Sequence, residues 1–274
     1  MARETDTARE SIVHFNVIKE IEVIDRTIMK EAEPFFFPGN DIGILVCHGF
    51  TGSTQSMRYL GKHLSTAGYT VIGPRLKGHG TTVQDMATTT AGDWIDSVDE
   101  ALATLRETCS QIFMVGLSMG GTLTLYTAAK HADVIRGAIS INAPVQIGSP
   151  DLAGLAFDRQ APELIGGVGS DLKDPGVKEL AYEQVPVPAL RQIYALTAVT
   201  RDLLPRIKCP TLVMQSRDDH IAQPVNATII AQLLGSTRIE LAWLENSFHV
   251  ATIDYDKDLI CEKATAFFKS IAGR

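Results

Sequence analysis

A serine stands between glycines at residues 116–120, where the sequence reads GLSMG. The pattern GxSxG is typical of a sharp turn between a strand and a helix, which exposes the serine hydroxyl on a strained backbone. Glycines suit the flanking positions because larger side chains would collide with the neighbouring strand and helix. Ser118 is therefore a candidate nucleophile. The alternative, a serine that caps a helix, would require a glycine on one side at most.

A serine hydroxyl is a poor nucleophile at neutral pH, so it needs a general base. His249 lies in LENSFHVATID, between the predicted strand RIELAW and the last predicted helix. A loop in that place opens at the carboxyl edge of the sheet, where open α/β folds bind ligands. His220 directly follows two aspartates, which suits a role in orienting a loop. We predict His249 as the base, and its alternative is a buried histidine bonded to backbone. The remaining histidines are His14, His48, His63, His79 and His131.

The acid that orients the histidine is expected in SRDDHIAQP, which follows the apolar run PTLVMQ. Asp218 and Asp219 both lie at the carboxyl end of this predicted strand. Pro224 is placed to begin the next helix, because proline is favoured at the first helical position. We favour Asp219, which leaves Asp218 as a solvated turn residue.

Donors for a developing negative charge are predicted in HGFTG, at residues 48–52 after DIGILVC. Glycine lets the chain turn so that the N–H of Phe50 can face a bound carbonyl oxygen. The second donor is the N–H of the residue after the nucleophile, Met119. Loss of one such donor typically costs about 3–4 kcal/mol of transition-state stabilisation. A plain glycine turn is the alternative explanation of residues 48–52.

The elements that must position these residues alternate along the chain from residue 41 onward. Short runs that are apolar nearly throughout are typical of parallel strands covered on both faces. Segments of helical period separate them, which predicts a doubly wound, mostly parallel α/β sheet. The predicted strands are 41–47, 69–73, 111–116, 137–142, 210–215 and 238–243. The predicted helices are 54–67, 92–108, 119–130, 225–234 and 257–271.

One interval, between the strands at 137–142 and 210–215, is too long for a single crossover helix. A structureless loop of that length is improbable inside a compact domain. We therefore expect a small, mostly helical cap at 147–204, with residues 34–146 and 205–274 as the core. Leu152 and Leu155 belong to the apolar content of this cap, which suits one wall of an apolar pocket. The first 33 residues are an N-terminal extension, in which EIEVIDRTIM could form an edge strand, a hairpin or a mobile arm.

Composition excludes several classes of protein. The net charge of −7 disfavours nucleic acid as a partner, because phosphate binding needs a basic surface. The N-terminus has no apolar core of signal-peptide length, and no run approaches the ~20 apolar residues that span a bilayer. The four cysteines are scattered without a CxxC pair, which predicts small, buried side chains that stay reduced. We expect a cytoplasmic protein with no metal or organic cofactor.

With these residues in place, the chain resembles the α/β-hydrolase family, and within it the bacterial carboxylesterase and monoacylglycerol lipase branch. The resemblance covers roughly residues 31–274 and rests on EAEPFFFPG, HGFTGS, PRLKGHG, GLSMGG, RDDHIAQP and ENSFHVATID. It implies a helical cap inserted between the sixth and seventh strands of the sheet. Carried over by position, it implies Ser118 as nucleophile, Asp219 as acid, His249 as base, and Phe50 and Met119 as oxyanion donors. It also implies that His79, in PRLKGHG, serves packing rather than chemistry.

The expected reaction is hydrolysis of a carboxylic ester through an acyl-enzyme intermediate. An apolar cap beside Phe50 favours an acyl chain, and we expect Phe50, Leu152 and Leu155 to contact the substrate. No large amphipathic lid stands out, so short- to medium-chain esters or monoacylglycerols fit better than emulsified triglyceride. The same catalytic groups hydrolyse thioesters and some carbon–carbon bonds, so a thioesterase or C–C hydrolase stays open. A non-catalytic ligand-binding protein on this fold is the alternative from another class.

Overall fold

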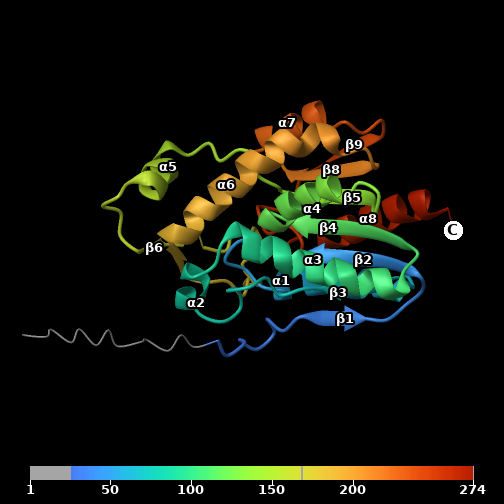
Figure 1. The fold of residues 1–274 in the computed structure, drawn as a ribbon, viewed down its shortest axis with the longest axis horizontal. Coiled ribbons are helices and arrows are strands. Elements are labelled where there is room, and N and C mark those ends of the chain that lie inside the picture. The colour runs from blue at the N-terminus through green and yellow to red at the C-terminus, as the bar shows by residue number, and fades with distance from the viewer. Residues whose placement is uncertain (1–25, 168, 274) are drawn as a thin grey trace, which may run out of the picture.

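The computed structural model describes residues 26–167 and 169–273 (Figure 1). Their centre is a seven-stranded sheet with the order β1-β3-β2-β4-β5-β8-β9. All neighbouring strands run parallel except β1, which pairs antiparallel with β3 at one edge. The strands are β1 (Phe35–Phe37), β2 (Ile42–Cys47), β3 (Thr70–Gly73), β4 (Gln111–Leu117), β5 (Ile135–Ile141), β8 (Thr211–Ser216) and β9 (Ile239–Leu244). The predicted fold class and its six strands are therefore confirmed, and β1 is added.

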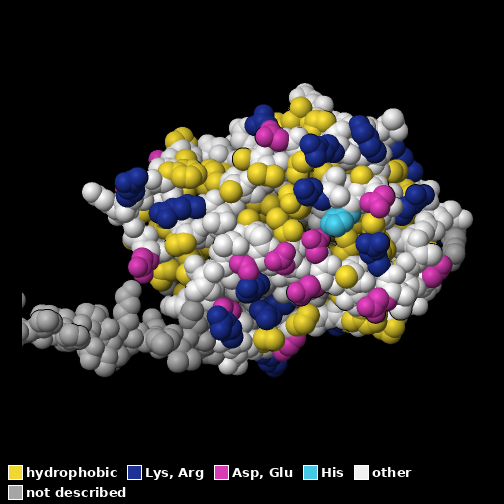
Figure 2. Space-filling model, in the orientation of Figure 1, with side chains coloured by type: hydrophobic (Ala, Val, Ile, Leu, Met, Phe, Trp, Pro, Cys, Tyr) yellow, Lys and Arg dark blue, Asp and Glu magenta, His cyan; other side chains and the backbone are white. Residues whose placement is uncertain are grey.

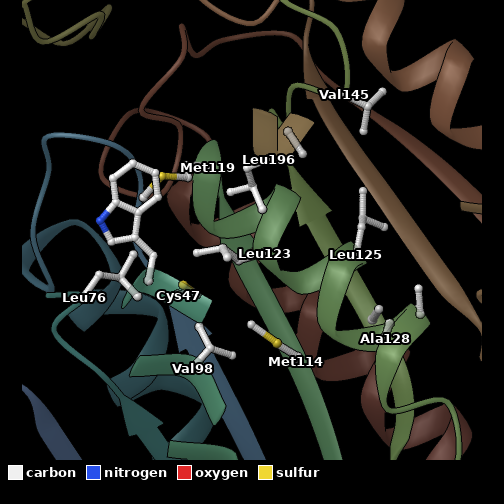
Figure 3. Packing of buried hydrophobic residues seen from close by; sticks show 14 of the residues in the cluster. Cys47, Leu76, Val98, Met114, Met119, Leu123, Leu125, Ala128, Val145 and Leu196 are labelled. Carbon is white, nitrogen blue, oxygen red and sulfur yellow. The ribbon is translucent and has the colours of Figure 1, made fainter. Parts of the chain in front are cut away.

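Helices cover both faces of this sheet. Side chains of α3 and α4 pack in one buried cluster, and those of α1 and α8 pack in the other. Figure 3 shows Leu123 of α4 and Val98 of α3 beside Met114 of β4 and Cys47 of β2. The helices of the core are α1 (Gln55–Thr66), α2 (Val83–Ala87), α3 (Ala91–Thr108), α4 (Met119–Lys130), α7 (Val225–Leu233) and α8 (Lys257–Ala272). The predicted helices match these within one residue at either end, apart from the short α2, which was not predicted.

The two clusters explain why the strands are apolar nearly throughout. Along β2, Leu45 and Cys47 belong to the α3 and α4 side, whereas Ile44 and Val46 belong to the α1 and α8 side. Successive side chains of a strand point to opposite faces, so a sheet covered on both faces needs apolar residues at every position. All six residues of β2 are buried.

A segment between β5 and β8 leaves the sheet. It contains α5 (Pro150–Phe157), the antiparallel pair β6 (Leu164–Gly166) and β7 (Gln184–Pro186), α6 (Val187–Leu203) and the 3-10 turn η1 (Leu204–Arg206). In Figure 1, α5 and β6 lie beyond the ends of the strands toward which the arrows of β2 and β4 point. Figure 2 shows hydrophobic side chains gathered over this part of the molecule, where Phe157 and Val199 are exposed.

The position expected for this insertion was wrong by one strand. It follows the fifth strand of the sheet rather than the sixth, because β1 is the single described strand that precedes β2. It also holds a short two-stranded sheet beside its helices. The boundaries 147–204 for a cap domain stay a prediction.

The N-terminal extension is described only from Arg26 onward. Most of EIEVIDRTIM lies outside the described residues, and its last four residues, 26–29, form no strand. Arg26 forms an ion pair with the buried carboxylate of Asp85, at 2.9 Å. The N–H of Met29 donates to the carbonyl of Gly80. The end of this segment is thus fastened to α2 and to the loop between β3 and α2.

The four cysteines form no disulfide with one another. Cys47 and Cys261 are buried as expected, whereas Cys109 and Cys209 are partly exposed, which corrects the expectation of fully buried thiols. Among the helices of the described residues, none combines the length and apolar character that a membrane span requires.

Candidate active site

Ser118 occupies the sharp turn between β4 and α4. Its backbone has φ 55° and ψ −124°, a conformation that L-residues rarely adopt and that costs of order 1–3 kcal/mol. A Cβ on Gly116 would overlap the backbone of Gly120, and one on Gly120 would overlap the backbone of Cys47. The glycines therefore let strand and helix approach closely enough for the turn that presents the serine, as predicted.

The structure brings Ser118, His249 and Asp219 together at the carboxyl edge of the sheet. The Oγ of Ser118 lies 2.8 Å from Nε2 of His249. The Nδ1 of the same ring lies 2.9 Å and 3.0 Å from the two carboxylate oxygens of Asp219. Because a carboxylate only accepts, Nδ1 carries the proton and Nε2 is free to accept one from the serine.

Asp219, the predicted acid, follows β8, and its neighbour Asp218 has different surroundings. Asp219 is buried, and its Oδ1 accepts hydrogen bonds from the N–H groups of Ile221 and Ala222. Its Oδ2 accepts one from the side chain of Gln215, at 3.1 Å. Asp218 is 59% exposed and lies 3.8 Å from the ammonium of Lys173. The structure thus places the favoured aspartate, and not the other, beside the imidazole.

The electrostatics favour a charged imidazole at His249. Burial lowers the pKa of His249, but the charge of Asp219 and its hydrogen bond raise it, and the carboxylates of Glu179 and Asp171 add to this effect. Together these carboxylates hold the pKa of His249 above its ordinary value. An imidazole in this setting can take a proton during a reaction and be stabilised while it holds it.

The two predicted oxyanion donors lie close to the serine. Phe50 lines the pocket that contains Ser118, and Met119 is the first residue of α4. Among the described residues, no backbone acceptor is bonded to the N–H of Phe50 or of Met119. A Cβ on Gly49 would lie 3.2 Å from the Cβ of Ser118, so the loop after β2 runs directly beside Ser118. These amides are free to bind a ligand oxygen.

Four of the other described histidines have contacts that do not involve Ser118. His48 and His79 are fully buried and stack edge to face, with ring centroids 5.2 Å apart. Burial lowers the pKa of His48 to about 4 and that of His79 well below its ordinary value, so both rings stay neutral. His131 follows α4 and lies 3.1 Å from a carboxylate oxygen of Asp99. His220 bonds to Asp171, as suits a residue that orients a loop.

A pocket opens above Ser118 and His249, and side chains of the inserted segment form much of its wall. Phe50 and Leu152, two of the residues expected to contact substrate, line it. Leu155, the third, lies one turn further along α5, and the pocket wall does not include it. The other apolar lining residues are Leu117, Pro144, Ile147, Ile165, Val185, Leu190, Ile193, Ile221, Ala222 and Val250.

Glu179 is a site residue that the sequence did not indicate. It lines this mostly apolar pocket, and burial raises the pKa of its carboxyl group to about 7. Among the described residues, no hydrogen-bond donor holds that carboxyl group. It lies in an irregular segment between β6 and β7, where no periodicity or motif marks it. The pocket therefore has one strong acceptor for a hydroxyl or a cation in an apolar wall.

Asn142 is a second residue that was missed. It follows β5 with φ 47° and is fully buried. Its Nδ2 donates to the carbonyl of His249 at 2.7 Å, and its Oδ1 accepts from the N–H of Ser216 at 2.7 Å. Its place as the last residue of the predicted strand 137–142, at the carboxyl edge, was the available signal. Asn142 ties the loop that carries His249 to the end of β8.

In the part of the chain that the structure describes, no cluster of three or more histidine, cysteine or acidic side chains is arranged to hold a metal ion.

Comparisons with known proteins place this geometry in a family. Residues 40–256 match the hydrolase family described as serine aminopeptidase, S33. The thermostable monoacylglycerol lipase of Bacillus sp. (strain H-257) is 48% identical over 246 residues, which cover 90% of this chain and 98% of that protein. The carboxylesterase of Bacillus subtilis (strain 168) is 31% identical over 243 residues, covering 87% and 97%.

Solved structures agree with the fold. A chain from the work on the metagenome-derived lipolytic enzymes LipS and LipT superposes with a TM-score of 0.88 at 50% identity, covering 89% of this chain and all of that one. The monoacylglycerol lipase of Paleococcus ferrophilus has a TM-score of 0.76 at 16% identity, covering 87% and 98%, which shows a shared fold. The chain therefore belongs to the hydrolase family described as serine aminopeptidase, S33, and has the α/β-hydrolase fold.

Proposed function

We propose that this protein is a serine hydrolase that cleaves carboxylic esters, with Ser118 as nucleophile, His249 as general base and Asp219 as the acid that orients it. The observation that carries the proposal is the 2.8 Å contact between Ser118 Oγ and His249 Nε2, on a ring whose Nδ1 faces Asp219. The names of the related lipase and carboxylesterase support the same bond type.

The reaction proceeds in two steps of acyl transfer. His249 accepts the Ser118 proton as the oxygen attacks the ester carbonyl, and Asp219 stabilises the imidazolium that forms. The carbonyl oxygen becomes an oxyanion that the N–H groups of Phe50 and Met119 bind. His249 then gives its proton to the leaving alcohol, and an acyl group remains on Ser118. His249 then takes a proton from a water molecule whose oxygen attacks this ester, and it returns that proton to the Ser118 oxygen as the carboxylic acid leaves.

The pocket suggests which ester. Its apolar wall of leucine, isoleucine and valine side chains suits an acyl chain. Glu179 offers a hydrogen-bond acceptor, which a monoacylglycerol could satisfy with the free hydroxyls of its glycerol. A simple alkyl ester would leave that carboxyl group without a partner, which is unfavourable in an apolar wall. We therefore infer a monoacylglycerol of short to medium chain length as the preferred substrate.

A comparison of four substrates tests this proposal: a monoacylglycerol, the methyl ester of the same acid, its acyl thioester, and an amino-acid p-nitroanilide. We expect the monoacylglycerol to have the highest kcat/KM and Ser118→Ala to abolish its turnover. Glu179→Gln should lower kcat/KM for the monoacylglycerol roughly tenfold and leave the methyl ester nearly unchanged, because only the former has hydroxyls for this carboxyl group.

Three results would contradict the assignment. Turnover of the monoacylglycerol by Ser118→Ala would show that Ser118 is not the nucleophile. A faster thioester would make the protein a thioesterase, and a faster anilide would make it an aminopeptidase, whose substrate ammonium Glu179 could also bind. Equal losses for both esters in Glu179→Gln would refute the alcohol-side role of this residue and leave the esterase assignment intact.

A further inference from the structure

Asp171 lies in the segment between β6 and β7 and touches both loops that carry the base and the acid. Its Oδ2 accepts hydrogen bonds from the N–H of His249 at 3.1 Å and from the N–H of His220 at 3.2 Å. Its Oδ1 accepts from Nδ1 of the His220 ring at 2.8 Å. Its carbonyl accepts from the N–H of Val250. One residue of the inserted segment thus bridges the residue after Asp219 to His249 itself.

The backbone of His249 is held from both directions. Its N–H donates to Asp171, and its carbonyl accepts from Asn142 at 2.7 Å. Both polar groups of this buried residue are therefore satisfied by side chains that are distant in the sequence. Removal of either partner would leave a buried polar group unpaired, which costs more than the hydrogen bond itself contributes.

The segment that carries Asp171 is itself anchored. The carboxylate of Asp254 is fully buried and accepts hydrogen bonds from the N–H groups of Lys173 and Asp174. It also accepts one from the N–H of Phe248, in the loop that carries His249, which we call the base loop. The ammonium of Lys173 lies 5.4 Å from the centre of the Phe248 ring. Asp171 is therefore presented by a short stretch of chain that is fixed to the base loop at several points.

We propose that Asp171 is a positioning residue for catalysis. Its carboxylate fixes the spacing between the loop that carries Asp219 and His220, the acid loop, and the base loop, and it places a negative charge near the His249 imidazole. The proposal rests on the Ser118, His249 and Asp219 mechanism proposed above. It goes beyond that mechanism because it assigns a second role to the inserted segment. This segment lines the substrate pocket and, through Asp171, also holds His249 in place.

Asp171 is one of three carboxylates whose charges act on the His249 imidazole. Asp219 faces the imidazole from the acid loop, and Glu179 and Asp171 face it from the inserted segment. His220 is the partner that Asp171 meets on the acid loop, and it is 59% exposed. The carboxylate of Asp171 is one of the groups that raise the pKa of His249. A base must be neutral to accept a proton, so activity is lost as the pH falls through this pKa.

Asp171→Asn tests the proposal, with kcat, KM and the pH profile of kcat/KM as readouts. We expect kcat to fall roughly ten- to hundred-fold with KM little changed, because the carboxylate supports the loops rather than the pocket wall. The acid limb of kcat/KM should move to lower pH, because loss of a nearby negative charge lowers the pKa of His249. A lower fraction of folded protein would reduce the rate but could not move this limb.

Asp174→Asn is the matched control, since Asp174 lies on the same stretch and, among the described residues, its side chain bonds locally, to the N–H of Gly176. Its acid limb should stay in place. If Asp171→Asn keeps the kcat and the acid limb of the wild type, or only lowers the melting temperature, the proposal is wrong.

His220→Ala keeps the test decisive if Asp171→Asn does not fold. This variant removes the ring that Asp171 holds and leaves the backbone bonds, so we expect a smaller loss of kcat at unchanged KM. An unaltered kcat would overturn the proposal. Ser118→Ala separates failure of the proposed mechanism from failure of the role of Asp171. If Ser118→Ala retains activity, the mechanism fails. If Ser118→Ala is inactive and Asp171→Asn is fully active, only the role of Asp171 is refuted.

Discussion

The proposed nucleophile and the proposed base of this site are held in place by different means. Ser118 is positioned by its immediate neighbours in the chain, through a strained turn that Gly116 and Gly120 make possible. His249 is positioned by side chains far away in the sequence, namely Asn142 and Asp171, which bind its carbonyl and its N–H. The first arrangement is local and can be recognised in a motif. The second exists only after the chain has folded.

This difference has a physical consequence. A strained turn between a packed strand and a packed helix has little freedom, so the serine stays in place when its surroundings relax. A loop that depends on hydrogen bonds to distant side chains moves when one of these bonds is lost. We therefore expect changes near Ser118 to act on folding, and changes near His249 to act on the rate.

Among changes that leave Ser118 in place, the largest effect on rate should come from Asp219, the proposed acid. Asp219→Asn can place an amide N–H toward Nδ1 of His249, which favours the tautomer whose Nε2 cannot accept the serine proton. In a comparable site this change lowers kcat about 10⁴-fold, and we expect a similar loss at unchanged stability. Steady-state kinetics together with thermal unfolding measure both quantities.

Asp218→Asn is the matched control for this change, because it alters the adjacent residue in the same loop. Its carboxylate is 59% exposed and has only a loose contact with Lys173. Surface pairs of this kind contribute about 0–1 kcal/mol, so activity should stay close to that of the wild type. A large loss in Asp218→Asn with a small one in Asp219→Asn would reverse the assignment of the acid.

Gly120→Ala should have the next largest effect, on stability. A Cβ at this position would overlap the backbone of Cys47 and of His48, which neither can avoid without moving β2. Overpacking of this kind typically costs about 1–3 kcal/mol and sometimes more. Chemical denaturation should show a loss in the free energy of unfolding at the upper end of that range, or no folded protein at all.

Gly154→Ala should change the free energy of unfolding least, and in the opposite direction. Gly154 lies inside α5, and a Cβ there would meet nothing within 4 Å. Alanine is favoured over glycine in a helix by about 0.8–1.0 kcal/mol, so this variant should be as stable as the wild type or slightly more stable. If both glycine variants lost the same stability, the close approach at Gly120 would not explain its requirement.

Sequence reasoning reached the parts of the molecule that are encoded locally. The strands were predictable because a sheet covered on both faces requires apolar runs such as GILVC. The turn at Ser118 was predictable because the GxSxG motif joins such a run to a helix. Asp219 and His249 could be indicated because each follows a predicted strand at the carboxyl edge. Their contact was still a prediction that only a folded chain could test.

The remainder depends on contacts between distant segments. Glu179 and Asp171 lie in irregular chain between β6 and β7, where neither spacing nor composition indicates which side chain faces the pocket or the base loop. Leu155 was assigned to the pocket from its apolar character alone, which does not show how far along α5 the pocket extends. β1 is three residues long, too short for its period to be read.

The central claim, acyl transfer to Ser118 with His249 as base, is tested most directly by isolating the covalent intermediate. The purified protein is mixed with a p-nitrophenyl ester, quenched in acid within the first turnover, digested, and analysed by mass spectrometry. We predict that the mass of the acyl group appears on the peptide that contains Ser118, and that it is absent in Ser118→Ala. Acylation of a different residue, or turnover without any acylated Ser118, would contradict the mechanism.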